Sequence, residues 1–252
     1  MNASEINKKV WEYRAYEFWN NQYSPGDLAK RIMENPTARL RYHQKYFENI
    51  KGLKIANPCG SNGRIAVPLT LLGADVTVID ISEENKRYAL ELAKCAGVSI
   101  NYEVCDFYEV PFDKYSEYFD TAYMEGGILH YFHYIDKFMN TLYSIIKPDG
   151  RLILSDFHPF RKIVSTSSSA MNVSQTGGNY FDTDVHNGNV AYKNFFPESE
   201  QNSFPDRSLR FYTLSEIINA VIKAGFTLKE FYEHPNWDDK RLPGEFTIYA
   251  VK

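Results

Sequence analysis

Residues 54–80 constrain the fold of this chain more than any other part of the sequence. They contain a short apolar run, a turn punctuated by glycines, a helix-length segment and a second apolar run that ends in Asp80. In α/β proteins this order places the N–H groups of the turn, and a carboxylate after the next strand, around an adenosine-bearing cofactor. The stretch therefore predicts a parallel sheet with a cofactor site at its carboxyl edge.

Length and composition indicate one globular domain. At 252 residues, with 44% apolar and 24% charged, the chain can bury a full hydrophobic core. A net charge of −4 without a basic block argues against nucleic acid as a partner. No stretch approaches the roughly 20 apolar residues of a membrane span, and the N-terminus lacks an apolar signal core. We therefore expect a cytoplasmic protein with no membrane partner.

Apolar strands and helix-length segments continue to alternate after Asp80. This alternation is typical of a parallel sheet that helices cover on both faces. The strands expected after the first one cover residues 76–79, 99–105, 118–124, 151–155, 226–232 and 246–251.

Capping residues and helical spacing mark the helices between these strands. Ser82 is placed to cap a helix that directly follows the second strand. Apolar residues at helical spacing predict a helix over residues 136–146, which a turn at residues 147–150 would end. Thr213 and Glu216 form a capping box for a helix near the C-terminus.

The N-terminal region does not follow this alternation. Residues 1–50 read as helices, the second beginning with a cap and a proline at Asn35 and Pro36, and they predict a cap over the sheet. The first helix carries an aromatic cluster of Trp11, Tyr13, Tyr16, Phe18 and Trp19. Such rings could close over a positively charged cofactor, or they could simply form core.

Residues 160–210 form an insertion. Its Ser/Thr-rich part at residues 165–169 is expected to be mobile. Further on, residues 184–190 place Asn187 and Gly188 where a two-residue hairpin turn would need them. The insertion is therefore predicted to contain a small β excursion.

The order of these signals resembles the class I (Rossmann-like) S-adenosylmethionine-dependent methyltransferases. The family places an acid after the second strand, an Asp after the third and an LKPGG-like turn before the fifth, and residues 146–150 read Ile-Lys-Pro-Asp-Gly. The resemblance is good over residues 53–156, extends through the C-terminal elements, and is weak over the N-terminal helices and the insertion.

The resemblance implies an α/β fold with three layers. A mostly parallel seven-stranded sheet would carry an antiparallel C-terminal hairpin, with helices on both faces. The single domain would comprise four segments: a helical cap, a cofactor-binding core, an insertion that serves as a substrate lid, and a C-terminal helix with a strand pair, at residues 1–50, 51–159, 160–210 and 211–252.

The glycine-containing turn departs from the family pattern. The family has an acid followed by GxGxG, whereas this chain has Asn57 in place of the acid. Gly63 aligns with the last glycine, and Gly60 needs a shift of one residue to match another. The contacts near the amino-acid end of the cofactor are therefore expected to be altered.

The resemblance implies S-adenosylmethionine as cofactor and S-adenosylhomocysteine as product. Asp80 would bind the ribose diol, Asp106 the exocyclic amine of adenine, and Glu125 the cofactor's ammonium or a cationic substrate. The alternatives are a helix cap for Asp80, a solvated loop acid for Asp106 and a helix-start carboxylate for Glu125. The predicted cofactor-binding residues are Trp11, Tyr16, Asn57, Gly60, Asn62, Gly63, Asp80, Ile81, Cys105, Asp106, Phe107, Glu125 and Gly126.

Two histidines follow the fourth strand and are candidates for catalysis. His130 and His133 are three residues apart, so on a helical turn both could face the site, and either could serve as a general base. One packed and one exposed histidine is the alternative. The predicted substrate-binding residues are Glu125, Asp156, His158 and Arg210.

No metal site is predicted. Cys59, Cys95 and Cys105 form no CxxC pair and suit a reducing compartment. Asp156 and His158, even with the acids and histidine of the insertion, lack any metal-specific spacing.

These observations predict methyl transfer to a nitrogen, oxygen or carbon atom of a small molecule by in-line displacement. One alternative is a non-catalytic binding or regulatory protein that keeps the transferase fold. Another is an NAD-dependent oxidoreductase, although the turn lacks GxGxxG. The insertion could also form a homodimer contact.

Overall fold

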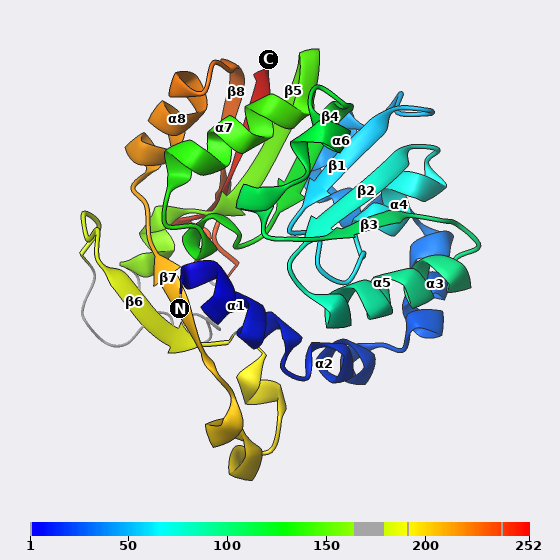
Figure 1. Cartoon of the computed structure of the whole chain (residues 1–252), viewed down its shortest axis with the longest axis vertical. Coiled ribbons are helices and arrows are strands. Elements are labelled where there is room, and N and C mark those ends of the chain that lie inside the picture. Colours follow the sequence, from blue (N-terminus) through cyan, green and yellow to red (C-terminus); the bar gives the residue numbers. More distant parts are fainter. Residues whose placement is uncertain (1, 164–178, 191, 238) are drawn as a thin grey trace.

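The computed structural model describes residues 2–163, 179–190, 192–237 and 239–252, and it is built around a seven-stranded sheet (Figure 1). The strand order is β3-β2-β1-β4-β5-β9-β8. The first five of these strands are parallel, and β9 is antiparallel to both of its neighbours. The predicted sheet with an antiparallel C-terminal hairpin is therefore confirmed. Its strands are β1 (Lys54–Pro58), β2 (Asp75–Asp80), β3 (Asn101–Val104), β4 (Phe119–Glu125), β5 (Ile146–Phe157), β8 (Thr227–Pro235) and β9 (Pro243–Val251).

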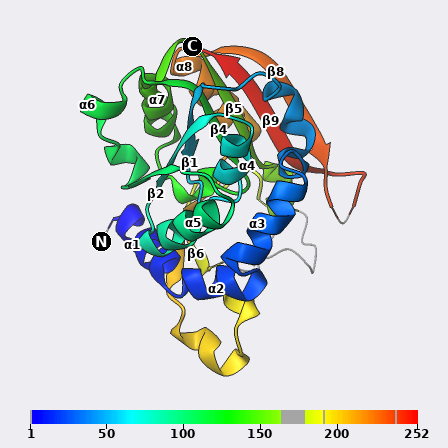
Figure 2. The same ribbon diagram turned by 90° about the vertical axis from the view of Figure 1, so that its right-hand side faces the viewer.

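Helices pack on both faces of this sheet, as predicted (Figure 2). Ser82 caps α5 and Thr213 forms a capping box with Glu216 in α8. Helix α7 buries its apolar stripe in the same hydrophobic cluster as α8. The helices that flank the sheet after β1 are α4 (Ala66–Leu71), α5 (Glu83–Cys95), α6 (Phe112–Tyr115), α7 (Ile135–Ile145) and α8 (Leu214–Lys223), with short 3-10 helices η2 (Phe107–Glu109), η3 (Leu129–Tyr131) and η4 (Pro159–Lys162).

The strand order reverses at β1, which pairs with β2 on one side and with β4 on the other. The helices that follow β1 and β4 therefore leave the sheet on opposite faces. Open α/β sheets bind ligands in the crevice that this divergence creates at the carboxyl ends of the strands. The fold thus places the site of interest at the ends of β1 and β4.

The N-terminal residues are helical, as predicted, but the predicted helix start at Asn35 was wrong. The cap followed by a proline lies at Ser24 and Pro25, where the Ser24 side chain accepts a hydrogen bond from the N–H of Asp27. Asn35 instead ends that helix, and the next segment is 3-10 and interrupted at Arg41, whose φ is 51°. The N-terminal elements are α1 (Ala3–Glu12), α2 (Ala15–Gln22), α3 (Pro25–Glu34) and η1 (Ala38–Tyr46).

The insertion contains a separate two-stranded antiparallel sheet of β6 (Val185–Asn189) and β7 (Asp206–Arg210). The predicted turn at Asn187 and Gly188 was wrong, because both residues lie inside β6. The chain between the strands instead forms η5 (Lys193–Phe195) and η6 (Glu198–Ser203) and buries aromatic rings against α1 and α2. This burial outweighs the local turn preference. The Ser/Thr-rich residues 165–169 lie outside the described residues.

The Lys-Pro-Asp-Gly segment is a bulge and not a separate turn. Strand β5 already begins at Ile146, and its register with β4 shifts between Phe119 and Thr121. Asp149 takes a left-handed conformation with a φ of 62°, which accommodates the extra residues. Across the described ranges, none of the helices is long and apolar enough to cross a membrane.

Candidate functional site

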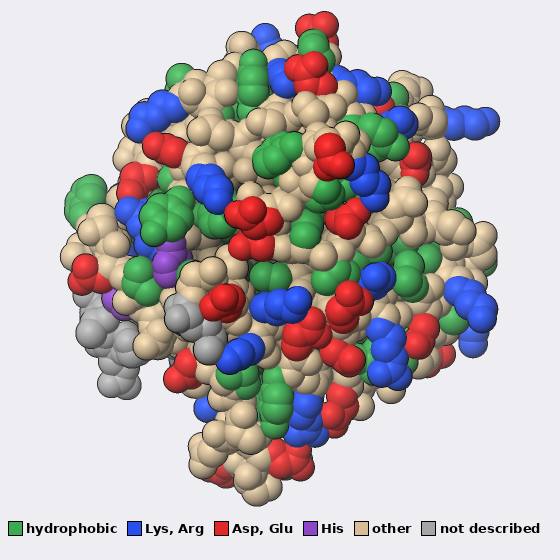
Figure 3. Space-filling model, in the orientation of Figure 1, with side chains coloured by type: hydrophobic (Ala, Val, Ile, Leu, Met, Phe, Trp, Pro, Cys, Tyr) green, Lys and Arg blue, Asp and Glu red, His purple; other side chains and the backbone are tan. Residues whose placement is uncertain are grey.

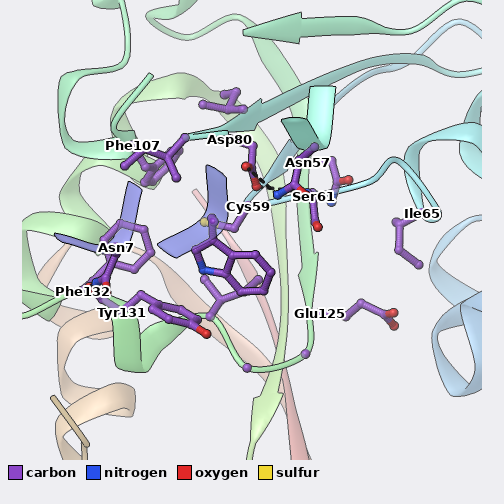
Figure 4. A pocket seen from close by; sticks show the side chains of 18 of the residues that line it. Asn7, Asn57, Cys59, Ser61, Ile65, Asp80, Phe107, Glu125, Tyr131 and Phe132 are labelled. Atoms are coloured by element: carbon purple, nitrogen blue, oxygen red, sulfur yellow. Dashed lines mark hydrogen bonds between the residues drawn. The ribbon is translucent and has the colours of Figure 1, made fainter. Parts of the chain in front are cut away.

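A cavity of about 150 Å³ lies at the carboxyl ends of β1, β2 and β4 and after β3, beneath helix α1 (Figure 4). In the close-up, Asp80 and Ser61 lie on one side and Tyr131, Phe132 and Asn7 on another. Both polar and aromatic side chains line it. Its lining comprises Ser4, Asn7, Trp11, Trp19, Asn57, Cys59, Gly60, Ser61, Arg64, Ile65, Ile79, Asp80, Ile81, Asn85, Cys105, Asp106, Phe107, Glu125, Gly126, Gly127, Ile128, Tyr131 and Phe132.

The turn after β1 takes a left-handed conformation at every second residue. The φ angles of Cys59, Ser61 and Gly63 are 53°, 48° and 76°. These are the positions of the three glycines in an acid-x-GxGxG pattern that begins at Asn57. Cys59 and Ser61 therefore adopt the conformation expected of the first two glycines. The alignment needs no shift of one residue to bring in Gly60.

Hydrogen bonds hold the two non-glycine residues in this conformation. The N–H of Cys59 donates to the carbonyl of Ile79 (2.7 Å), and the N–H of Ser61 donates to Asp80 Oδ2 (3.0 Å). The Tyr102 hydroxyl donates to the Ser61 carbonyl (2.8 Å). A left-handed conformation costs a non-glycine residue about 1–2 kcal/mol, which these contacts offset.

Gly60 is required for a different reason, because it packs directly on Asn57. A Cβ atom at Gly60 would lie 2.2 Å from Asn57 Oδ1. The amide nitrogen of Asn57 donates to the Tyr123 carbonyl (2.9 Å), whereas its Oδ1 is buried without a protein partner. Among the described residues, Oδ1 is thus an unsatisfied buried acceptor beside the cavity.

Asp80 is buried at the end of β2 and already accepts three hydrogen bonds. The donors are the N–H groups of Ser61 (3.0 Å) and Ser82 (3.1 Å) and the side chain of Asn85 (3.3 Å). Burial raises the pKa of Asp80, and these donors lower it. Since a carboxylate offers about four acceptor positions, Asp80 retains room for roughly one further donor.

The segment after β3 brings Cys105, Asp106 and Phe107 to the cavity, as the sequence suggested. Asp106 caps the short η2 helix and accepts a hydrogen bond from the N–H of Tyr108 (3.0 Å). Phe107 is buried beside it. Asp106 therefore has a structural role as well as a place in the cavity wall.

Glu125 and Arg64 bring opposite charges to one end of the cavity. Burial raises the pKa of Glu125, and the nearby arginines, Arg39 first among them, lower it. Burial also lowers the pKa of Arg64 to about 10, and in the part of the chain that the structure describes Arg64 forms no salt bridge. Sequence reasoning missed Arg64, although its place directly after the last glycine of the turn was a usable signal.

Several predicted cofactor residues lie outside the cavity. Tyr16 packs on Tyr88 and donates to Glu91 (2.6 Å), whereas Trp19, from the same predicted aromatic cluster, lines the cavity and donates to Asn85 (2.8 Å). Asn62 and Gly63 belong to the turn but do not line the cavity. A Cβ atom at Gly63 would lie 2.9 Å from that of Ala89, so this glycine permits helix α5 to pack closely.

The two candidate histidines do not share a face. The helical turn covers only Leu129–Tyr131, and Phe132 is extended, so the spacing of His130 and His133 is not helical. His133 Nε2 lies 3.3 Å from Ser208 Oγ. His130 is buried and faces a second cavity of about 40 Å³, and burial lowers its pKa to about 3.

The remaining predicted substrate residues make protein contacts away from the larger cavity. Asp156 accepts hydrogen bonds from four N–H groups, those of Gly127, Ile128, Leu129 and Phe157. It thereby shapes the loop after β4. His158 Nε2 lies 2.9 Å from Glu233, and Arg210 forms a salt bridge of 2.7 Å with Glu216. Within the described residues, no group of three His, Cys, Asp or Glu side chains is placed to hold a metal ion.

The sequence from the end of β1 through most of β5 matches a known family. The family model, described as a methyltransferase domain, matches residues 58–154. Residues 58–154 therefore belong to the methyltransferase-domain family. The family predicted from the sequence is thereby confirmed.

Among curated proteins, this methyltransferase is similar to a Haemophilus influenzae protein described as uncharacterized. The two are 25% identical over 256 residues, which cover 96% of this chain and 92% of the relative. It is also 30% identical to the ubiquinone biosynthesis O-methyltransferase of Rickettsia bellii over 166 residues. That match covers 64% of this chain and 65% of the Rickettsia protein, which is less than two thirds of its length.

Solved structures show the same fold. An S-adenosylmethionine-dependent methyltransferase from Mesorhizobium loti has a TM-score of 0.62 and 19% identity, covering 87% of this chain and 100% of that one. The magnesium protoporphyrin IX methyltransferase of Synechocystis PCC 6803, with bound S-adenosylhomocysteine, has a TM-score of 0.63 and 16% identity over 100% of both chains. This likeness concerns the architecture of the methyltransferase and not its acceptor.

Proposed function

We propose that this methyltransferase transfers the methyl group of S-adenosylmethionine to a small-molecule acceptor bound in the larger cavity. The observation that carries the proposal is the chemistry of the cavity wall. A carboxylate, an aromatic segment and a pair of opposite charges line it in separate places. These groups correspond to the ribose, the adenine and the amino-acid end of the cofactor.

The residues present fit the cofactor. Asp80 would accept a ribose hydroxyl, and Asp106 and Phe107 would meet the adenine. At the other end, Arg64 and Glu125 would meet the carboxylate and the ammonium. Gly126 has a φ of 85°, and a Cβ atom there would meet nothing within 4 Å, so its backbone borders open space. When bound, the cofactor supplies a methyl group on a positively charged sulfur, which is already activated for displacement.

The protein's own contribution is then alignment and exclusion of water. Helix α1 covers the cavity with Ser4, Asn7 and Trp11. The Trp11 ring packs edge-on against Tyr131, with ring centroids 5.8 Å apart. Aromatic faces at this place would attract a sulfonium as they attract other cations.

Neither candidate histidine lines the larger cavity, so we propose no general base among them. With a pKa of about 3, His130 is neutral at physiological pH and a weak proton acceptor. We infer that the acceptor atom attacks with an available lone pair. The name of the Rickettsia relative makes an oxygen acceptor the first to test.

Calorimetry with S-adenosylhomocysteine tests the cofactor site. Asp80→Asn keeps the shape of the side chain but removes its charge, so we expect at least a tenfold loss of affinity, about 1.4 kcal/mol. Asp75→Asn is the matched control, because it makes the same change at the exposed start of β2 and should bind like the wild type. Equal affinities for both variants and the wild type would contradict the assignment of Asp80.

A non-catalytic binding protein is the alternative that the altered turn motivates. The left-handed conformations at Cys59 and Ser61 speak against it, because the turn keeps its family geometry despite the substitutions. If millimolar S-adenosylmethionine produces no heat with the wild-type protein, the alternative becomes the better account.

A further inference from the structure

Arg207 is a buried cation in the insertion. It lies in β7 and is 2% exposed, among the largest fully buried side chains of the molecule. One terminal nitrogen of its guanidinium donates to the Tyr131 hydroxyl (3.1 Å), and its Nε is buried without a partner. Among the described residues it forms no salt bridge. Buried charges are ordinarily paired, because an unpaired one loses its hydration without compensation.

Neighbouring cations of the insertion are paired. Arg210, on the same strand, is held by Glu216 at 2.7 Å, and Lys162 lies 3.9 Å from Asp182. Among the described residues, Arg207 therefore differs from these two cations in being buried without an acid.

Arg207 stands directly behind the wall of the larger cavity. Its partner Tyr131 lines that cavity beside Trp11. Asn7, which also lines it, fastens β7 in place by exchanging two hydrogen bonds with the backbone of Ser208 (2.9 and 2.8 Å). The guanidinium thus reaches the cavity through the tyrosine hydroxyl, which accepts from Arg207 and keeps its own proton to donate.

A second unpartnered polar atom lies close by. His130 Nε2 is buried without a partner, and the positive charge of Arg207 adds to burial in lowering the pKa of this histidine. A neutral imidazole beside a cation can donate its N–H to an anion. The loop after β4 and strand β7 therefore bring together donors that lack an acceptor.

We propose that the methyl acceptor carries a carboxylate, which accepts a hydrogen bond from the Tyr131 hydroxyl at the cavity wall, and that Arg207 acts through this hydroxyl as the positive charge behind it. This inference rests on the proposed function and names the class of its substrate. A hydrogen bond from a charged group to the Tyr131 hydroxyl makes that hydroxyl a stronger donor, and an unpaired positive charge behind it favours an anion over a neutral group. The aromatic rings of Trp11, Tyr131 and Phe132 suit a small apolar or aromatic body for the rest of the molecule.

Thermal unfolding in saturating S-adenosylhomocysteine tests the inference, with benzoate as the probe and benzamide as its neutral counterpart at equal ionic strength. We expect benzoate, but not benzamide, to raise the melting temperature of the wild type. Arg207→Met should weaken the benzoate response at least tenfold and raise the melting temperature of the ligand-free protein, since it removes an unpaired buried charge. Arg207→Lys keeps the positive charge but replaces the planar guanidinium by a single ammonium group, so it should give an intermediate response to benzoate.

Arg210→Gln is the matched control, because it removes a paired arginine from the same strand and should leave the benzoate response unchanged. A response to benzoate that persists in Arg207→Met, an equal response to benzamide, or a response to phenyl phosphate alone would overturn the inference. S-adenosylhomocysteine affinity separates the two proposals. If the wild type does not bind S-adenosylhomocysteine, the proposed function is contradicted. If a variant at Arg207 loses the benzoate response but keeps its affinity for S-adenosylhomocysteine, the result tests carboxylate recognition alone.

Discussion

At the scale of single residues, Ser61 combines two unfavourable features that glycine would remove. Its φ is 48°, and its hydroxyl is buried without a partner. We expect Ser61→Gly to stabilise the protein by about 0.5–1 kcal/mol, after allowing for the greater freedom of glycine in the unfolded chain. Urea unfolding measures the gain. Ser61→Ala is the control, since it removes the hydroxyl but keeps the left-handed backbone, and an equal gain there would show that the backbone is not strained.

Two buried histidines should make the protein less stable in acid. Burial lowers the pKa of His130 to about 3 and that of His43 to about 4. A lowered histidine pKa gives stability that is present above the unfolded value of about 6.5 and is lost as the pH falls through it. Each histidine should therefore cost about 2 kcal/mol between pH 7 and pH 5.

Urea unfolding at the two pH values measures this loss. His130→Phe should remove roughly half of it. An unchanged difference between pH 7 and pH 5 in that variant would mean that His130 does not titrate as its burial implies.

The sequence allowed only part of the site to be predicted at this scale. Asp80 and Asp106 were found because each ends a readable strand, and both line the cavity. Arg207 could not be found, because its burial depends on contacts that no local pattern records. Asn7 holds the neighbouring Ser208 from 201 positions away. Arg64 was missed although it directly follows the last glycine of the turn, and Trp19 belonged to an aromatic cluster that could equally have formed core.

At the scale of secondary-structure elements, Asn7 fastens α1 to β7 and to the loop after β4. Its side chain is 4% exposed and contacts the backbone of Ser208 and the carbonyl of Tyr131. Asn7→Ala would leave buried backbone groups without partners, so we expect a loss of about 2–3 kcal/mol together with weaker S-adenosylhomocysteine binding.

Asn2→Ala is the matched control for this prediction. Asn2 caps the same helix at an exposed position, so its loss should cost about 1 kcal/mol and leave cofactor affinity unchanged. If both variants weaken S-adenosylhomocysteine binding equally, then cofactor affinity depends on the stability of α1 and not on its attachment to β7.

Helices that begin at local capping residues were predictable from the sequence, whereas elements shaped by contacts with distant residues were not. Ser82 and Thr213 satisfy their helix ends locally, so their helices begin where the sequence indicated. Asn187 and Gly188 carry a strong turn signal, yet pairing with β7 extends them into a strand. Tertiary contacts decided the outcome there.

At the scale of the whole molecule, charges of both signs are interspersed over the face in Figure 3. The net charge is −4. Because the surface has no large patch of one charge on this face, we expect a ligand to stabilise the protein only if it fits the cavity. At a hundred times its dissociation constant, S-adenosylhomocysteine should add about 2.7 kcal/mol, or roughly 5–10 °C in melting temperature. NAD at the same concentration should leave the melting temperature unchanged, and a shift with NAD alone would contradict the proposed function.

The attachment of α1 to β7 also has a consequence during synthesis. Helix α1, at residues 3–12, is made long before β7, at residues 206–210 (Figure 1). Helix α1 therefore lacks its contact with β7 until the residues between them have been translated, and this contact is among those of greatest sequence separation. A nascent chain can complete β1 to β5 before it can enclose a cofactor, so chains that stop before residue 206 should not retain one.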